Sequence, residues 1–348
     1  MSIISIFAGH VSVNAHEDFR LFINASPQTD TNGETLIKNQ IQPNTSTTYR
    51  GAYIGMGNVE AGVPLTSKET WVKMDYRSMD RATSHAPRFG LRATDGTEIL
   101  VVNTLDYSFG AAQTDLNFFG TRMYVLHQGS IGRIPIDARI TVDSGTLVGT
   151  VRLYIGLVHI GDYTKQLTAD QAAKVPYQLF YRNILNDRSE DNRIYQMMAT
   201  QGEPTTNKKL KVISLDGDGT FSDFNGTVTD INETVSTPSL NTVDTTVPDA
   251  KSTFTTEAIS QVAKESYKVT SIIPAALATA GAGTLNNLEF ICTDGVTVHT
   301  LGVQRQISSE IGTESIMTNE TINPFTGTAF TMEDLDILEF GFRAKSEV

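Results

Sequence analysis

Short segments in which apolar and polar residues alternate recur along the chain, and the clearest is 134–142. Every second residue there is apolar: Ile134, Ile136, Ala138, Ile140 and Val142. Neighbouring residues of a β-strand point to opposite faces, so this pattern predicts a strand with one buried face. A turn at 143–146 and a second apolar run at 147–155 complete a predicted hairpin.

Further strands are expected on both sides of this hairpin. In the segment 70–76, Val72 and Met74 share a face with Tyr76, and Trp71 lies on the other face. A hairpin is predicted over 89–103, because Asp95 and Gly96 supply the positive φ angles that a tight turn needs. The segment 122–127 predicts another strand.

The last third of the chain repeats this period of two. Strands are predicted at 267–272, 288–291 and 296–301, and a final apolar strand at 338–342. The pattern differs between 164 and 200, where Thr168 to Gln171 resembles a helix cap and Pro176 interrupts the run that follows. We expect a connector with some helix there.

The predicted fold class is therefore all-β, with two β-sandwich, jelly-roll-like domains joined by a partly helical connector. The expected boundaries are an N-terminal arm (1–25), a jelly-roll domain (26–165), the connector (166–208) and a C-terminal β-sandwich (209–348). Short apolar runs such as 3–8 have little reason to be exposed, so we expect the arm to dock onto another protein.

Charge and composition narrow the function. The 348 residues carry a formal net charge of −12, so the surface lacks the basic character of nucleic-acid binding. The first residues have no basic region of a signal peptide, and no segment approaches the roughly 18 apolar residues of a membrane span. We expect no membrane insertion. Cys292 is the single cysteine and lies in an apolar run, which predicts a buried side chain.

No motif predicts catalysis or a bound cofactor. Glu333, Asp334 and Asp336 precede the last strand and are expected to form a solvated turn. Asp216 to Thr220 is similar to a calcium loop, but the twelfth position is Asn225 where a bidentate glutamate is needed. This segment predicts either a surface turn or a weak calcium site. The six histidines show no zinc-ligand spacing: His10, His16, His85, His127, His159 and His299.

Exposed aromatic rings would instead indicate sugar binding, because the apolar face of a pyranose stacks on a ring. The candidates are Trp71, Tyr49, Tyr53, Tyr177 and Tyr181. For Trp71 two interpretations stay open, an anchor of the core and a glycan contact.

The order of these segments resembles a known family. The hairpin 134–142 with the run 147–164 is similar to the back-to-back strands of concanavalin-like, laminin-G-type jelly rolls. With the segments 193–201, 225–233, 264–269 and 323–330, and the closing strand, the chain looks like a two-part structural protein of tailed-bacteriophage virions. The resemblance implies a non-enzymatic virion component, often a symmetric oligomer, with no catalytic residues.

The predicted function is therefore assembly into a bacteriophage virion, as a head decoration, a collar or neck protein, a fibre or another appendage subunit. The expected partners are other virion proteins and further copies of the chain, and the protein would be assembled in the cytoplasm of the bacterial host. The alternative is a glycan-binding module that recognises a host surface glycan. A third class, a glycoside hydrolase or lyase, would need a cleft with facing carboxylates.

Overall fold

The computed structural model describes most of the chain and divides it into two compact units, Met1–Leu210 and Lys211–Val348. The described residues are 2–7, 27–29, 35–40, 53–55, 57–78, 88–105, 113–127, 132–182, 191–211, 213, 215–231, 243–259, 268–278, 280, 285–307 and 314–346. Every strand pair in them is antiparallel, and helices are short. The all-β class is confirmed.

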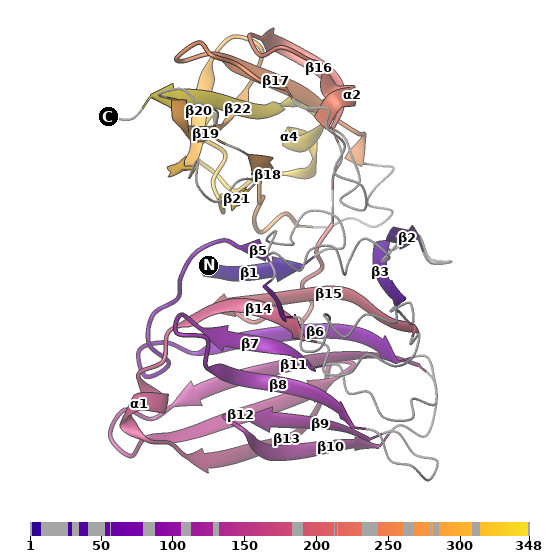
Figure 1. Ribbon diagram of the computed structural model, residues 1–348, viewed down its shortest axis with the longest axis vertical. Helices are drawn as coiled ribbons and strands as arrows, with labels where there is room; N and C mark the ends of the chain where they lie inside the picture. The colour runs from indigo at the N-terminus through magenta and orange to yellow at the C-terminus, as the bar shows by residue number, and fades with distance from the viewer. Residues whose placement is uncertain are drawn as a thin grey trace, which may run out of the picture. The chain divides into compact units, whose positions relative to one another are not determined.

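The larger sheet of the first unit has nine strands (Figure 1). Seven follow the order β13-β12-β11-β6-β15-β1-β5, and β3 pairs with β15 and with β2. Their bounds are β1 (Ser2–Phe7), β2 (Pro27–Thr29), β3 (Thr35–Gln40), β5 (Gly57–Asn58), β6 (Thr70–Ser78), β11 (Gly132–Val142), β12 (Val148–Ile155), β13 (Val158–Gln166) and β15 (Asp191–Gln201). The predicted hairpin over 134–155 is the pair β11 and β12.

The smaller sheet has six strands in the order β10-β9-β8-β7-β14-β4. Their bounds are β4 (Tyr53–Gly55), β7 (Arg88–Ala93), β8 (Glu98–Leu105), β9 (Gln113–Phe118), β10 (Thr121–His127) and β14 (Pro176–Arg182). The predicted hairpin over 89–103 is β7 and β8, and Gly96 in its turn has a φ of +83°. Only a glycine adopts such an angle without strain.

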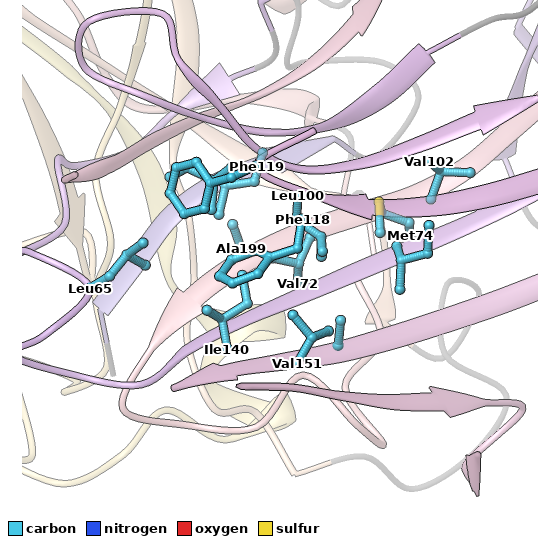
Figure 2. Packing of buried hydrophobic residues seen from close by; sticks show 14 of the residues in the cluster. Leu65, Val72, Met74, Leu100, Val102, Phe118, Phe119, Ile140, Val151 and Ala199 are labelled. Carbon is cyan, nitrogen blue, oxygen red and sulfur yellow. The ribbon is translucent and has the colours of Figure 1, made fainter. Parts of the chain in front are cut away.

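The two sheets enclose one hydrophobic core. Figure 2 shows Val72, Ile140 and Val151 of the larger sheet beside Leu100 and Phe118 of the smaller one. These five side chains are fully buried. Because successive residues of a strand alternate between faces, the neighbours of Val72, Ile140 and Val151 point away from this core.

The second unit is built on a five-stranded sheet in the order β16-β17-β22-β19-β20. Its strands are β16 (Leu215–Ser222), β17 (Lys251–Thr256), β19 (Leu285–Thr293), β20 (Val298–Gln306) and β22 (Glu339–Ser346). The core lies between this sheet and a two-stranded ribbon of β18 (Ala275–Ala278) and β21 (Glu314–Met317), with helix α4 (Met332–Ile337). The layer that faces this sheet is thus smaller than the second sheet of a β-sandwich.

The predicted connector and arm differ from the structure. The short helix α1 (Ala169–Ala172) has the expected cap on Thr168, but β14 and β15 are integral strands of the two sheets. Residues expected to form the N-terminal arm include β1, which pairs with β15 and β5 and buries Ile3 and Ile4. Residues 8–25 lie outside the described part. The sequence predicts that the apolar run 3–8 is covered by another protein, because a single strand does not reveal its partners within the chain; in the structure β1 finds them in its own sheet.

Three further predictions were wrong in local detail. Lys268–Ser271 is not a strand. Glu333, Asp334 and Asp336 lie in helix α4, where Thr331 Oγ1 accepts from the backbone N of Asp334 at 3.1 Å. Asp216 and Asp218 lie in strand β16 rather than in a loop. Among the described residues, no helix has the length and apolar character to cross a bilayer.

Candidate functional site

The face of the larger sheet that points away from the core carries polar and aromatic side chains. We call this surface the outer face. On β6, Val72 and Met74 enter the core, so Trp71 and Lys73 lie on the outer face. Strand pairing then fixes which residues of the other strands lie beside them, because directly opposite residues share a face.

Two neighbouring rows cross the outer face from β15 to β13. The first row is Thr200, Trp71, Arg139, Arg152 and Asp162. The second row is Met198, Lys73, Asp137, Tyr154 and His159. The outer face therefore gathers charged and ring-bearing side chains from β6 and from the consecutive strands β11, β12 and β13.

One part of the outer face is covered by the segment Gly202–Leu210, which follows β15. Thr205 Oγ1 donates to Asp137 Oδ1 at 2.7 Å, and the side chain of Gln196 bonds the backbone N and O of Leu210. Asp137 is 1% exposed, and its nearest cation is Lys73 at 3.8 Å. Burial raises the pKa of the Asp137 carboxyl, which Lys73 only partly opposes. These groups hold the segment in place and are not accessible to a ligand.

The rest of the outer face, over β11 to β13, is accessible. Half of the His159 side chain is exposed, as are 40% of Arg152 and 37% of Asp162. Tyr154 is partly exposed. We call these four side chains the exposed patch.

Three rings lie across the strands at this patch. The Trp71 and Tyr154 ring centroids are 6.0 Å apart with an interplanar angle of 23°, and the Tyr154 and His159 centroids are 5.5 Å apart. Trp71 itself is 6% exposed. Its Nε1 donates to Glu69 at 3.0 Å, and the Arg139 guanidinium lies 6.0 Å from its ring. The buried Trp71 ring thus stacks against the partly exposed Tyr154 ring and supports it.

A bidentate ion pair adjoins these rings. Arg152 Nε and Nη2 donate to the two carboxylate oxygens of Asp162 at 2.8 and 2.7 Å, and His159 Nε2 lies 3.0 Å from Asp162 Oδ1. Hydrogen bonds from Arg152 and then from His159 lower the pKa of Asp162. The carboxyl is therefore ionised at neutral pH and accepts hydrogen bonds, while Arg152 donates them.

The other predicted aromatic candidates are not part of this patch. Tyr177 is half-buried on β14. Tyr49 and the side chains of Tyr53 and Tyr181 lie outside the described residues.

The remaining candidates for chemistry have structural roles. Asp216 accepts from Thr255 at 2.9 Å, and Asp218 accepts from the backbone of Val228, which opens helix α2 (Val228–Ile231). Within the described ranges, no group of three metal-ligating side chains comes together. Cys292 is fully buried, and burial raises its pKa to about 12, so the thiol is protonated at neutral pH.

Sequence patterns alone missed Tyr154, His159, Arg139 and Arg152. The sequence does contain a signal for three of them. Arg139, Arg152 and Tyr154 occupy positions that alternate with the apolar, core-facing residues of β11 and β12. The pattern shows that they leave the core, but only the pairing of β6, β11, β12 and β13 places them beside Trp71.

Comparisons with known proteins find similar folds at low identity. No family model matches the chain, and no curated protein matches it. The Lotus tetragonolobus seed lectin is 14% identical, covers 51% of this chain and 92% of its own, and has a TM-score of 0.32. The CBM2 module of the evolved Dit of Lactobacillus casei BL23 phage J-1 is 13% identical, with coverages of 56% and 99% and a TM-score of 0.33.

The alginate lyase Aly36B, solved with an alginate trisaccharide, is 12% identical, with coverages of 56% and 100% and a TM-score of 0.37. Scores this low carry no conclusion about the activity of this chain. The expectation that this chain is not an enzyme stays a prediction.

Proposed function

We propose that the first unit is a carbohydrate-binding module whose glycan lies on the exposed patch of the outer face. The observation that carries this proposal is the position of the Tyr154 and His159 rings directly beside the bidentate pair of Arg152 and Asp162. This is the alternative function that the sequence analysis left open. Trp71 acts in it as the support of Tyr154.

The chemistry of the patch suits a sugar in two ways. The partly exposed Tyr154 ring offers an apolar surface for the C–H face of a pyranose, and we take this contact to be worth what a pair of aromatic rings contributes, about 0.5–1.5 kcal/mol. Arg152 donates hydrogen bonds and Asp162 accepts them, whereas sugar hydroxyls do both. A charged partner makes each of these bonds stronger than one between neutral groups.

The carboxylates near the patch favour binding over hydrolysis. A glycosidase needs a protonated carboxyl as general acid and a second carboxylate facing it. Asp162 is held ionised by Arg152, and Glu69 accepts from both Trp71 and Arg139. Both groups are thus engaged in holding neighbouring side chains.

A glycan array with the purified protein tests this proposal. Tyr154→Ala removes the exposed ring and should weaken binding to the best glycan by roughly threefold to tenfold, the equivalent of one stacking contact. Trp71→Ala should also weaken binding, because Tyr154 loses its support. Tyr177→Ala, on the other sheet, is the control and should bind normally.

Circular dichroism of each variant must first show the β-spectrum of the wild type. No binding by the folded wild-type protein to any glycan would contradict the proposal. Unchanged binding by Tyr154→Ala would place the site elsewhere.

We further propose, from the family resemblance in the sequence, that this module belongs to a bacteriophage virion and assembles there with itself and other virion proteins. Mass spectrometry of purified particles should detect the chain, and electron microscopy should locate it. Its absence from particles, with the protein present in the lysate, would refute this assignment.

A further inference from the structure

The hairpin of β12 and β13 ends in exposed apolar side chains. Leu157 is 56% exposed, Val158 63% and Ile160 37%. They are three of the nine large hydrophobic residues that are exposed among the described residues, and they lie within four consecutive positions. We call these three side chains the apolar tip. Single exposed apolar residues are ordinary, whereas adjoining ones are typical of a contact surface.

The turn of this hairpin is strained at Leu157. Ile155 pairs with Val158, so Gly156 and Leu157 are the two central residues of the turn, with φ angles of +56° and +70°. A turn with two positive φ angles favours asparagine or glycine, because a larger side chain in this region crowds the backbone. Leu157 thus costs the fold free energy twice, through its backbone angle and through its exposed apolar surface. A residue kept at such a cost indicates a contact with a ligand.

A β-bulge joins the apolar tip to the exposed patch. Tyr154 pairs with His159 and Leu153 pairs with Gly161, so Ile160 is an extra residue without a partner on β12. Bulges bend a strand and redirect its side chains, and they are common next to functional sites. The His159 ring lies 5.5 Å from that of Tyr154, and the next residue along the chain already belongs to the tip. The patch and the tip therefore adjoin.

The size of the apolar tip suits a small group better than a protein partner. A stable protein interface takes about 800 Å² and roughly 20–30 residues from each partner, whereas the tip has three side chains. Val158 is paired with Ile155, the residue after Tyr154, so about 3.3 Å of strand separates the position of the ring from the tip. An apolar group carried by a ligand of the patch would thus reach the tip.

The groups beside the tip favour an acyl substituent over a plain hydrocarbon one. An acyl group combines a carbonyl oxygen, which accepts hydrogen bonds, with an apolar methyl group or longer chain. Arg152 is 40% exposed, and its guanidinium has more N–H groups than the two that bond to Asp162. The tip supplies the apolar surface next to it. An acyl group is also neutral, so the net charge of −12 does not repel it.

We propose that the exposed patch binds an acylated oligosaccharide, with an acyl group of the sugar lying on the apolar tip. This inference rests on the proposed function and specifies its substrate class. The sugar ring stacks on Tyr154, and the acyl group covers Leu157 and Val158. Binding removes the tip from water, which offsets the cost of exposing it. N-acetyl and O-acetyl groups share this chemistry.

A glycan array that presents every oligosaccharide with and without its acetyl groups tests this inference. Chito-oligosaccharides beside cello-oligosaccharides of the same length provide a pair that differs in N-acetyl groups. Acetylated beside deacetylated xylo-oligosaccharides provide a pair that differs in O-acetyl groups. The glycan with the strongest signal should be an acetylated one, and its class distinguishes the two sources of the acyl group.

Titration calorimetry then measures the contribution of the acetyl group. The wild type should bind the acetylated form of the best glycan roughly fourfold to fifteenfold more tightly than the form without acetyl groups, the effect expected from burying one or two methyl-sized groups. The preference should persist at high salt, because it depends on apolar contact and not on charge.

The double variant Leu157→Asn with Val158→Thr removes the apolar surface and suits the turn, because asparagine adopts a positive φ more readily than leucine. It should bind the acetylated and unacetylated glycans equally, with its affinity for the unacetylated one unchanged. Its melting temperature should equal or exceed that of the wild type, so unfolding would not explain the loss. Val296→Thr with Val303→Thr removes two exposed valines from the second unit and is the matched control, which should bind like the wild type.

The outcomes separate this inference from the proposed function. Equal or weaker binding of acetylated glycans by the wild type would overturn the acyl assignment and leave carbohydrate binding intact. A preference for acetyl groups that the double variant retains would overturn the role of the tip. Failure of the folded wild type to bind any glycan would overturn both proposals. Wild-type dimers that form without glycan and dissociate in the double variant, measured by analytical ultracentrifugation, would assign the tip to a second copy of the chain instead.

Discussion

Trp71 illustrates how a side chain can be buried without belonging to the core between the two sheets. It is 6% exposed, yet it lies on the outer face, where Tyr154, Arg139 and Glu69 surround it. The sequence left open whether Trp71 anchors the core or contacts a glycan. In the structure Trp71 stacks against the partly exposed ring of Tyr154, and its contribution to glycan binding stays a prediction.

Asp137 has a direct consequence for the pH dependence of stability. Burial raises its pKa above the ordinary value of 3.8, so the folded state binds the proton more tightly than the unfolded state. The stabilisation is complete below that value and is lost as the pH rises through the raised pKa. Asp137→Asn removes this titration. The melting temperature of the wild type relative to the variant should therefore fall as the pH rises above that ordinary value.

Asp143 provides a control of opposite sign. Hydrogen bonds from Thr146 lower its pKa in the exposed turn between β11 and β12. A lowered pKa adds stability above the ordinary value, which is lost on acidification. Relative to Asp143→Asn, the wild type should thus become more stable as the pH rises.

For Asp137, a difference in melting temperature between the wild type and Asp137→Asn that is the same at every pH would contradict the raised pKa.

At the scale of elements, strand pairing explains where the predictions succeeded. The hairpins over 134–155 and 89–103 were found because each is local, with its turn and both strands in one stretch of sequence. β14 and β15 were assigned to a connector because their partners lie far away in sequence. β15 pairs with β6 and β1, and its apolar residues Met197 and Ala199 enter the core made by those distant strands.

Gly90 shows how closely β7 and β8 approach. A Cβ atom at Gly90 would overlap the backbone carbonyl oxygen of Leu100 on the paired strand. Gly90→Ala should therefore destabilise the first unit by about 1–3 kcal/mol, the usual cost of overpacking. Urea denaturation measures it. Gly145→Ala is the control, because the nearest atom, Asp143 Oδ1, would lie 3.5 Å away. Equal stability of the two variants would show that the ladder accommodates the methyl group.

At the scale of the whole molecule, the two units have separate hydrophobic cores. The buried cluster of the first unit draws on residues from Ile4 to Ala199, and that of the second on residues from Ile259 to Leu338. Separate cores are what independent folding requires. The boundary at Leu210 and Lys211 also matches the end of the segment that covers the outer face.

Fragments 1–210 and 211–348 should consequently each fold alone. Differential scanning calorimetry should give one cooperative transition for each fragment, and fragment 1–210 should retain the glycan binding of the full chain. The intact protein provides the reference transitions. A fragment without a transition would show that its core depends on the other unit.

The sequence by itself determined the all-β class, the local hairpins and the burial of residues such as Ile140 and Cys292, because alternation and turn chemistry are properties of short segments. Only the tertiary structure decided which strands are neighbours. That pairing brings Trp71, Tyr154 and His159 together and sets Arg77 opposite Arg133 and Arg193. It also places the apolar residues 3–6, which the sequence assigns to an arm, in a sheet. A period of two fixes the face on which a residue lies, but it contains no information about the residue that lies opposite.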